Sequence, residues 1–396
     1  MKKIAIIGGG ASGLLCAIFC AQKSLHVDLF EQNSKCAKKI LVSGNGRCNI
    51  TNRSLHVEDF FGDNISFVKD ALDEFSFKEF EKFCHSIGLL LDIKDDGRCY
   101  PLSNEAKSVS SLLINYATRL GVNIHVDTKI TDIKKLCDDY HSVVIATGSE
   151  AASHLGGNRD GLEFALNFGH TTVPTYPSLV QFHLNSNIAH KMSGVKLAGE
   201  VTLLVNNKKD STCRGDVLFT NYGVSGFAIL DISQRASVAL MEYSKVDISV
   251  NLLPEFNAKK LSDHITKVAS LQKEFTILDI LAGLVPVKIA HGLLEDLKLS
   301  HSTCTEDIGT KMAKKIANQM LNWRFEVQET HGFRHAEVAG GGVNTTEVNP
   351  KTMQSLKQDN LYFCGEVLDV VGRRGGYNFA WCWASAYMCA KDITKA

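Results

Sequence analysis

The first thirty-one residues constrain the fold more than any other part of the chain. Residues 4–7 (IAII) are a short, uncharged, isoleucine-rich run, which is typical of a strand buried on both faces of a parallel sheet. The run is followed by GGGASG over 8–13, which matches G-x-G-x-x-G, and then by apolar residues at helical spacing to about Lys23. A second strand over 26–31 ends in Glu31. Strand, glycine turn, helix, strand and carboxylate together predict a dinucleotide-binding fold.

The same opening segment has a competing interpretation as a secretory signal peptide. Two lysines precede the apolar run, and Leu15-Cys16-Ala17 is similar to a lipoprotein cleavage site. Cleavage there would destroy a complete nucleotide motif. We therefore interpret the segment as a cofactor site.

Each residue type in the motif has a chemical task. Gly8 permits the tight turn, Gly10 lets the backbone approach a pyrophosphate, and Gly13 brings helix and strand together. The helix expected from Ala11 offers unpaired amide hydrogens to the phosphates. Glu31 is placed to accept hydrogen bonds from ribose hydroxyls.

Composition narrows the class of protein. The chain has 396 residues, which favours two or three domains, and its 43 basic and 43 acidic residues give no net charge that would recruit nucleic acid. Its twelve cysteines are scattered and lack CxxC spacing, so we expect reduced thiols and a cytoplasmic protein. We expect no membrane span and no metal site, and we read His331 and His335 as part of a loop.

Three later segments carry further glycine and polar patterns. Residues 38–52 contain a glycine loop with clustered polar side chains. Residues 143–148 (VVIATG) and 361–366 (LYFCGE) each read as a buried strand that ends in glycine, the second with a carboxylate.

Together these segments resemble flavoproteins of the glutathione reductase type, and more narrowly the BaiN/RdsA family of FAD-dependent oxidoreductases. The matching stretches are KKILVSGNGRCNIT at 38–51, GDVLFTNYGVSGFAIL at 215–230, and the block within 336–386 that contains AGGGVNTTEVNP, CGEVLD and GGYNF. The chain departs from the family at Asn45, where relatives usually carry glycine, and at Phe227, where they usually carry proline.

The resemblance implies an α/β fold in which a Rossmann-like FAD domain is split by an inserted domain, part β-barrel-like and part helical. It implies non-covalent FAD, with NAD(P)H as a transient electron donor. It places Lys38, Lys39, Ser43 and Gly44 near the ribityl chain and pyrophosphate, and the backbone of Ile130, in a strand-like segment, near adenine. It also places Glu366 near the ribityl chain, and the start of a helix at Asn378 and Phe379 near the flavin O2 edge. The expected cofactor residues are therefore Gly8, Gly10, Ser12, Gly13, Glu31, Lys38, Lys39, Ser43, Gly44, Ile130, Thr147, Gly148, Gly365, Glu366, Asn378 and Phe379.

Because cofactor motifs lie near both ends of the chain, we expect the FAD domain to comprise 1–188 and 336–396. The insertion at 189–335 divides into barrel-like parts, 189–255 and 322–335, and a helical part, 256–321, where apolar spacing changes from two to three or four residues. A second dinucleotide fold is missing: Gly340-Gly341-Gly342 precedes a strand-like run over 343–348 rather than a helix. This disfavours a disulfide reductase.

Three classes of function stay open. The first is hydride transfer at flavin N5 with a small-molecule substrate, as an oxidase or as a reductase. The second is reduction of uridine in ribosomal RNA, with lysines such as Lys259 and Lys311 as contacts, although nearby acids such as Asp263 favour a solvated mixed surface. The third is a non-catalytic FAD-bound interaction protein.

Candidates for proton transfer are Cys48, His183, Asp369 and Tyr377. Arg47 and the neighbouring lysines could shift the pKa of the Cys48 thiol, whereas the alternative is that Cys48 merely packs the loop. Arg373 and Arg374 could meet an anionic substrate, or form a solvated pair.

Overall fold

The computed structural model describes residues 2–395, which form two compact units. The first unit joins the chain up to Tyr176 to the segment from Glu337 onward, and the second comprises Pro177–Ala336. The nucleotide motifs at both ends of the sequence thus belong to one unit.

A five-stranded parallel sheet forms the centre of the first unit. Its strand order is β17 (Leu361–Phe363), β8 (Ser142–Ile145), β1 (Lys3–Ile7), β2 (His26–Phe30), β7 (Asn123–His125). Side chains in the middle of β1, including Ile4 and Ile6, are completely buried, as is typical of a central strand in a parallel sheet. The two strands expected around the glycine turn, and the order strand–helix–strand, are confirmed.

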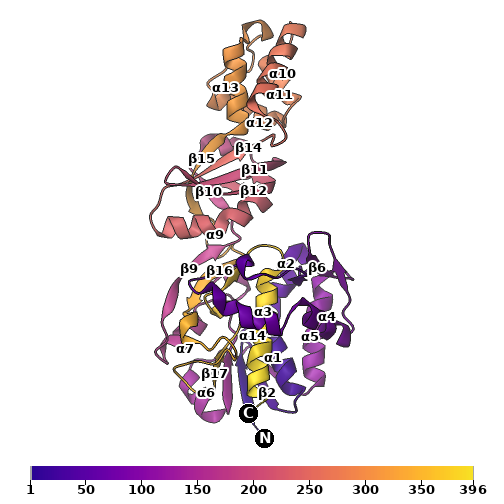
Figure 1. Ribbon diagram of the computed structural model, residues 1–396, viewed down its shortest axis with the longest axis vertical. Helices are drawn as coiled ribbons and strands as arrows, with labels where there is room; N and C mark the ends of the chain where they lie inside the picture. The colour runs from indigo at the N-terminus through magenta and orange to yellow at the C-terminus, as the bar shows by residue number, and fades with distance from the viewer. Residues whose placement is uncertain (1, 396) are drawn as a thin grey trace. The chain divides into compact units, whose positions relative to one another are not determined.

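Two helices pack together beside this sheet: α1 (Ala11–Ala21) and the C-terminal helix α14 (Tyr377–Ile393), which lie side by side in Figure 1. Indole nitrogens anchor α14 to backbone carbonyls that are distant in sequence. Trp381 Nε1 donates to Gly365 O at 3.1 Å, and Trp383 Nε1 donates to Ile50 O at 2.8 Å. The last helix of the chain is therefore fixed to the segments that follow β17 and α2.

Smaller elements complete the first unit. The remaining helices are α2 (Lys38–Gly46), α3 (Lys69–Glu74), α4 (Phe77–Ser86), α5 (Ala106–Arg119), α6 (Ile133–Asp139) and α7 (Asp160–Leu166). There are three small sheets. In the first, β6 (Arg98–Pro101) lies between β3 (Thr51–Asn52) and β5 (Leu91–Ile93). The other two pair β4 (Phe60–Phe61) with β18 (Val371–Gly372), and β9 (Thr172–Ser178) with β16 (Val338–Val343).

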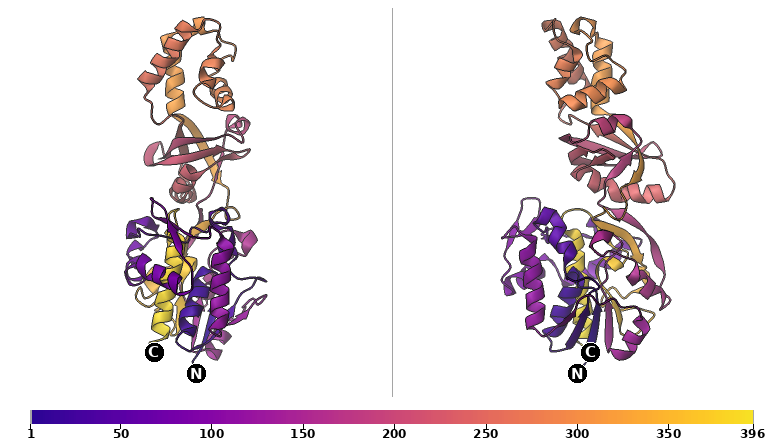
Figure 2. Two further views of the ribbon diagram at one scale, coloured as in Figure 1. Left: turned by 90° about the vertical axis from the view of Figure 1, so that its right-hand side faces the viewer. Right: turned by 180° about the vertical axis from the view of Figure 1, so that it is seen from behind.

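The second unit is a closed antiparallel barrel with helices. The strand order is β10 (Phe182–Leu184), β13 (Gly223–Ser225), β12 (Lys208–Phe219), β11 (Lys196–Val205), β14 (Val246–Asn251), β15 (Trp323–Thr330). Helices α8 (Asn187–Lys191) and α9 (Phe227–Met241) accompany the barrel. Figure 2 shows the other helices, coloured orange, grouped at one end of the barrel: α10 (Ala258–Leu271), α11 (Ile277–Ala282), α12 (Val287–Asp296) and α13 (Thr310–Leu321). The expected barrel with a helical part is confirmed.

The structure differs from the sequence interpretation in four places. Residues 177–188, which the sequence assigns to the FAD domain, contribute β10 and the start of α8 to the second unit. The glycine loop at 38–52 contains a kinked helix, α2. Residues 128–131 form no strand. The glycine triplet at 340–342 lies inside β16, and Thr345–Glu347 form a short 3₁₀ turn rather than a strand. Each difference depends on packing between distant segments, which local patterns do not report.

Both departures from the family pattern suit their backbone positions. Asn45 has a φ of 56°, a left-handed conformation that asparagine tolerates better than most residues. Phe227 is the first residue of α9, where proline is also favoured because it has no N–H that must be satisfied. Within residues 2–395, no helix has both the length and the apolar character needed to cross a membrane.

Candidate functional site

Three glycines shape the turn between β1 and α1, and each meets a different requirement. Gly8 has a φ of +111°, and a Cβ there would lie 2.4 Å from Ala146 O. A Cβ on Gly13 would lie 1.8 Å from Gly8 O, so only glycine permits this approach of helix to strand. A Cβ on Gly10 would meet no described atom within 4 Å. Open space therefore lies where the motif needs a pyrophosphate to approach the backbone.

The N-terminus of α1 faces this space with its amide hydrogens uncapped. Gly10 is the N-cap residue, and among the described residues no side chain caps the helix and no acid lies in its first turn. Unpaired amides and the helix dipole give such a terminus a partial positive charge. This end of α1 is therefore suited to hold phosphate.

Glu31 follows β2 directly and is 8% exposed. Its Oε2 accepts a hydrogen bond from Gly9 N at 2.9 Å, and its Oε1 accepts from the backbone and side-chain nitrogens of Asn33 at 2.8 and 2.6 Å. Lys38 Nζ donates to Asn33 Oδ1 at 2.9 Å, so Lys38 is connected to the Glu31 carboxylate through Asn33. Sequence reasoning missed Asn33, because nothing local marks it as a partner of the carboxylate.

We expect that Glu31→Ala weakens retention of FAD by roughly tenfold to 150-fold, the equivalent of about 1.5–3 kcal/mol for hydrogen bonds to a charged group. The measurement is equilibrium dialysis of the reconstituted protein against FAD. Glu31→Gln is the matched control, since it keeps the shape and one acceptor, and should lose less. Equal retention by wild type and Glu31→Ala would remove Glu31 from the site.

A second polar group joins four segments around Glu366. Its Oε2 accepts from Lys39 Nζ at 3.0 Å, and its Oε1 accepts from Ala339 N at 2.8 Å. A Cβ on Gly148 would meet no atom nearer than Glu366 Oε2 at 4.0 Å. Gly365 approaches the Ser12 side chain so closely that an added Cβ would lie 2.1 Å from its Oγ. The structure thus brings together Ser12, Lys39, Gly148, Gly365 and Glu366, as expected for one binding site.

Thr147, beside Gly148, has a buried Oγ1 with no hydrogen-bond partner in the described structure. Gly161 leaves little room beside this atom, since an added Cβ would lie 2.0 Å from it. The side chain therefore faces α7 rather than open space. Only the backbone of Thr147 is available to a ligand.

The start of α14 forms a third part of the site. Gly376, the N-cap residue, has a φ of +96°, and an added Cβ would lie 2.3 Å from Thr51 O. No described side chain caps the helix. The Asn378 amide group is occupied, because its Oδ1 accepts from Gly372 N at 2.8 Å and its Nδ2 donates to Gly372 O at 2.7 Å. Asn378 therefore offers its backbone amide, rather than its side chain, to a ligand.

Four other expected residues have more local roles. Ser43 Oγ donates to Ile40 O at 2.7 Å, and Gly44 adopts a left-handed φ of 57° that kinks α2. Ile130 lies in an irregular segment and packs against the core, and Thr128 N donates to Glu31 O at 2.9 Å in the same segment. This segment therefore lies beside Glu31 although it is not a strand. The Phe379 ring stacks on Trp383, 5.7 Å between centroids.

The candidate proton-transfer groups differ in their surroundings. Asp369 is 2% exposed, its Oδ2 accepts from Asp63 N at 2.8 Å, and burial raises the pKa of its carboxyl. Tyr377 OH accepts from Arg373 at 3.2 Å. Cys48 is fully buried, and burial raises the pKa of its thiol to about 11, which is opposite to the shift that a reactive thiol needs. The surroundings favour a packing role for Cys48.

We therefore expect that Cys48→Ala keeps turnover within about twofold of wild type across pH 6–9, because a thiol with a pKa near 11 stays protonated throughout this range. The measurement is the pH profile of kcat/KM for both proteins. Loss of an alkaline limb in the variant would restore Cys48 as a catalytic candidate.

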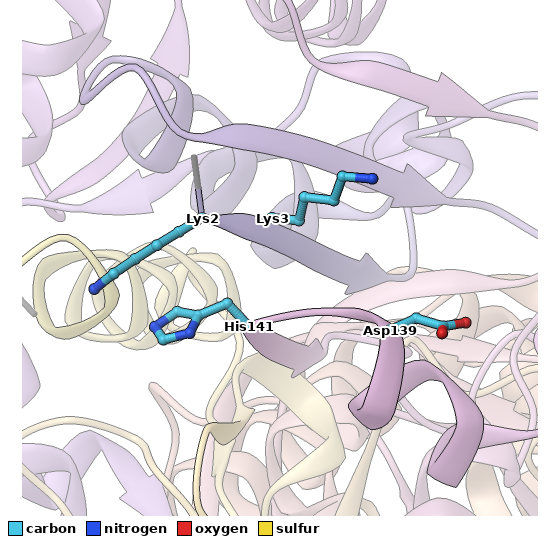
Figure 3. A pocket seen from close by; sticks show the side chains of 4 residues that line it. All are labelled: Lys2, Lys3, Asp139 and His141. Carbon is cyan, nitrogen blue, oxygen red and sulfur yellow. The ribbon is translucent and has the colours of Figure 1, made fainter.

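The first unit also has an open depression that does not include the glycine turn. Figure 3 shows Lys2, Lys3, Asp139 and His141 around it, and His141 N donates to Lys3 O at 2.9 Å. These residues precede or begin β1 and β8, so they lie at the amino ends of the strands. Dinucleotides bind at the carboxyl ends of parallel strands. We assign this depression no cofactor role. Within residues 2–395, no group of three or more His, Cys, Asp or Glu side chains is arranged to hold a metal ion.

The space beside Gly10, the uncapped start of α1 and the buried Glu31 carboxylate together fit a dinucleotide. The family model described as "HI0933-like protein Rossmann domain" matches residues 2–392. The chain belongs to the HI0933-like family. The resemblance drawn from the sequence motifs is thereby confirmed, and the protein is a flavin-dependent oxidoreductase.

Relatives of this HI0933-like chain match it along its full length. It is 31% identical to the 3-dehydro-bile acid delta(4,6)-reductase of Clostridium scindens, with complete coverage of both chains. It is 29% identical to the ribosomal RNA dihydrouridine synthase of Escherichia coli, with coverage of 99% and 98%. The fold is similar to that of 3-ketosteroid delta1-dehydrogenase from Sterolibacterium denitrificans, at a TM-score of 0.50, 11% identity and complete coverage of both chains.

Proposed function

We propose that the protein reduces a carbon–carbon double bond conjugated with a carbonyl group in a small molecule, with non-covalent FAD as cofactor and NAD(P)H as electron donor. The observation that carries this proposal is the full-length, 31% identity to a reductase of 3-dehydro bile acids.

The names of two relatives both describe the reduction of a ring double bond. A delta(4,6)-reductase of a 3-dehydro compound acts on ring double bonds in a molecule with a ring ketone, and dihydrouridine is uridine with two hydrogens added to its ring. Both changes add a hydride and a proton across a double bond. In the proposed reaction, NAD(P)H and a proton are consumed, the double bond becomes saturated, and NAD(P)⁺ is released.

Bound FAD would supply hydride transfer at N5. The chain's own residues bind and orient it. Glu31 and the start of α1 would hold the ribose and pyrophosphate, and Lys39, paired with Glu366, would add positive charge beside the phosphates. The start of α14 would stabilise negative charge at the N1 and O2 edge.

Reduction of RNA is the alternative, and two ribosomal RNA dihydrouridine synthases at 29% identity favour it. Charge in the second unit weighs against it, because three arginines on its strands and on α9 are paired with carboxylates. Arg214 pairs with Glu200 at 2.8 Å, Arg235 with Asp210 at 2.7 Å, and Arg324 with Asp247 at 2.7 Å. A polyanion is bound by cations that are available to phosphate. The small-molecule substrate therefore ranks first.

The test is an anaerobic assay of the FAD-loaded protein with NADH or NADPH. One arm contains a steroid with a 3-ketone and 4,6-double bonds, a second contains a simple cyclic enone, and a third contains ribosomal RNA that lacks dihydrouridine. We expect saturation of the enone double bond, detected as loss of its ultraviolet absorbance, in the first or second arm. Turnover of RNA alone would replace the proposal with the alternative, and turnover in no arm would overturn both.

We also propose a cytoplasmic location. The support is chemical: none of the twelve cysteines forms a disulfide in the described structure, and several lie buried as small apolar side chains, which suits a reducing compartment.

A further inference from the structure

The six residues before α14 are held by two distant segments, at Asn52 and at residues 59–61, and by Asn378 of α14 itself. This turn, residues 371–376, begins with β18, which pairs with β4, and ends in Gly375 and Gly376 with φ values of +132° and +96°. Two consecutive glycines in this region leave the backbone permissive. The position of the first turn of α14 therefore depends on side-chain contacts.

Asp59 provides the first contact. Its side chain is buried, its Oδ2 accepts from His56 N at 2.9 Å, and its Oδ1 pairs with Arg373 at 2.5 Å. Arg373 N also donates to Asp59 O at 3.0 Å. The same guanidinium donates to Tyr377 OH at 3.2 Å and lies 5.0 Å from the centre of the Tyr377 ring. Arg373 thus bridges a buried carboxylate and the first residue of α14.

Asn52 and Asn378 provide the other two contacts. Asn52 Nδ2 donates to Gly375 O at 3.0 Å, and the Asn378 amide binds both the N–H and the C=O of Gly372. Asn52 is a buried side chain of β3, from the segment after α2, whereas Asn378 belongs to α14 itself. The turn is therefore fixed at Gly372, Arg373 and Gly375.

We propose that Asn52, Asp59 and Arg373 act as positioning residues that set the reduction potential of the flavin by fixing the uncapped start of α14. This inference rests on the proposed placement of the flavin O2 edge beside α14. Reduction adds negative charge at N1 and O2, and a helix N-terminus stabilises that charge only within about its first turn. A looser turn should therefore lower the reduction potential.

The test measures the midpoint potential of FAD-loaded variants by dye equilibration. Asn52→Ala changes no charge, Arg373→Lys keeps the charge but loses the planar fork that joins Asp59 to Tyr377, and Arg373→Gln loses both. We expect each variant to shift the ratio of reduced to oxidised flavin at least tenfold toward oxidised, which is about 30 mV for a two-electron couple. Lys82→Gln is the matched control for charge, because Lys82 is 62% exposed on α4 and pairs with Glu79 there.

Two results would overturn the inference in different ways. If Arg373→Gln lowers the potential but Arg373→Lys and Asn52→Ala do not, the arginine acts by charge alone. If none of the three variants differs from Lys82→Gln, the flavin does not lie beside α14. FAD content and the thermal unfolding midpoint are measured for every variant, so a protein that has lost its fold is recognised. Turnover is not part of this test, and a wrong substrate assignment would leave its outcome unchanged.

Discussion

Replacing Gly10 with aspartate is expected to abolish FAD binding and to leave the apoprotein folded. A side chain at this position has room, because an added Cβ meets no described atom within 4 Å, and the φ of −79° is open to any residue. Aspartate is also a better N-cap than glycine, so the free energy of unfolding of the apoprotein should rise by a few tenths of a kcal/mol. The new carboxylate would, however, repel the pyrophosphate and compete for the amides at the start of α1.

We expect the affinity for FAD to fall at least a hundredfold, which corresponds to about 2.7 kcal/mol. The measurements are FAD titration of the apoprotein and thermal unfolding without FAD. Gly10→Ser is the control, since serine caps the helix without a charge and should retain more affinity. Gly13→Ala provides the opposite case: its Cβ would lie 1.8 Å from Gly8 O, so the fold itself should be destabilised. A Gly10→Asp protein that retains FAD would place the pyrophosphate elsewhere.

These glycine positions were predictable because their constraints are local. The turn, the helix and the carboxylate at Glu31 lie within thirty-one residues, and the chemistry of each step follows from its immediate neighbours. Local geometry of this kind can be read from spacing alone. The start of α14 at Tyr377 was expected from the family resemblance instead.

Contacts between distant segments could not be predicted in this way. Asn52 donates a hydrogen bond to Gly375, which lies 323 residues away in the sequence. Asp59 and Arg373 form an ion pair and are separated by a similar length of chain. The Arg373 side chain is 54% exposed, so it is solvated as one alternative predicts, but it is also paired with the buried Asp59 carboxylate, which the sequence does not indicate. No periodicity or motif contains such pairings, because only the assembled fold brings the partners together.

Motif residues can also have roles that are purely structural. Glu347, in the segment EVNP that supports the family resemblance, accepts from Thr171 N and from Lys357 Nζ, each at 2.7 Å. These contacts tie the turn after β16 to the start of β9 and to the segment before β17. The recurrence of a residue in a motif therefore does not separate binding from support. Contacts in the structure make that distinction.

The first residue of the inserted domain could not be predicted from local sequence either. We expected the second domain to begin at 189, yet residues from Pro177 belong to it, because β10 closes the barrel between β13 and β15. Strand β10 is three residues long, Phe182–Leu184. A strand this short carries no periodic signal, so its membership is decided by pairing partners far along the chain.

The last prediction concerns how electrons reach the flavin. Within residues 2–395 one parallel sheet has a glycine turn and an uncapped helix suited to a pyrophosphate, and FAD should occupy it. The second unit is an antiparallel barrel with helices, and the glycine triplet at 340–342 packs inside β16, where a Cβ on Gly341 would lie 2.2 Å from Pro174 O. Neither provides a second site of the dinucleotide type. We therefore expect NADH and NADPH to bind weakly and transiently.

We expect each nucleotide to reduce the flavin slowly, with an apparent Kd nearer millimolar than micromolar, which corresponds to roughly 4–5 kcal/mol of binding. The measurement is anaerobic stopped-flow bleaching of the flavin absorbance across a range of NADH and NADPH concentrations. A rate that rises without saturation into the millimolar range is the expected result, because a nicotinamide that lacks a pyrophosphate cradle gains few contacts beyond those of its ring. Saturation at low micromolar concentration would show a dedicated nucleotide site, and would contradict the assignment of a single dinucleotide fold to this chain.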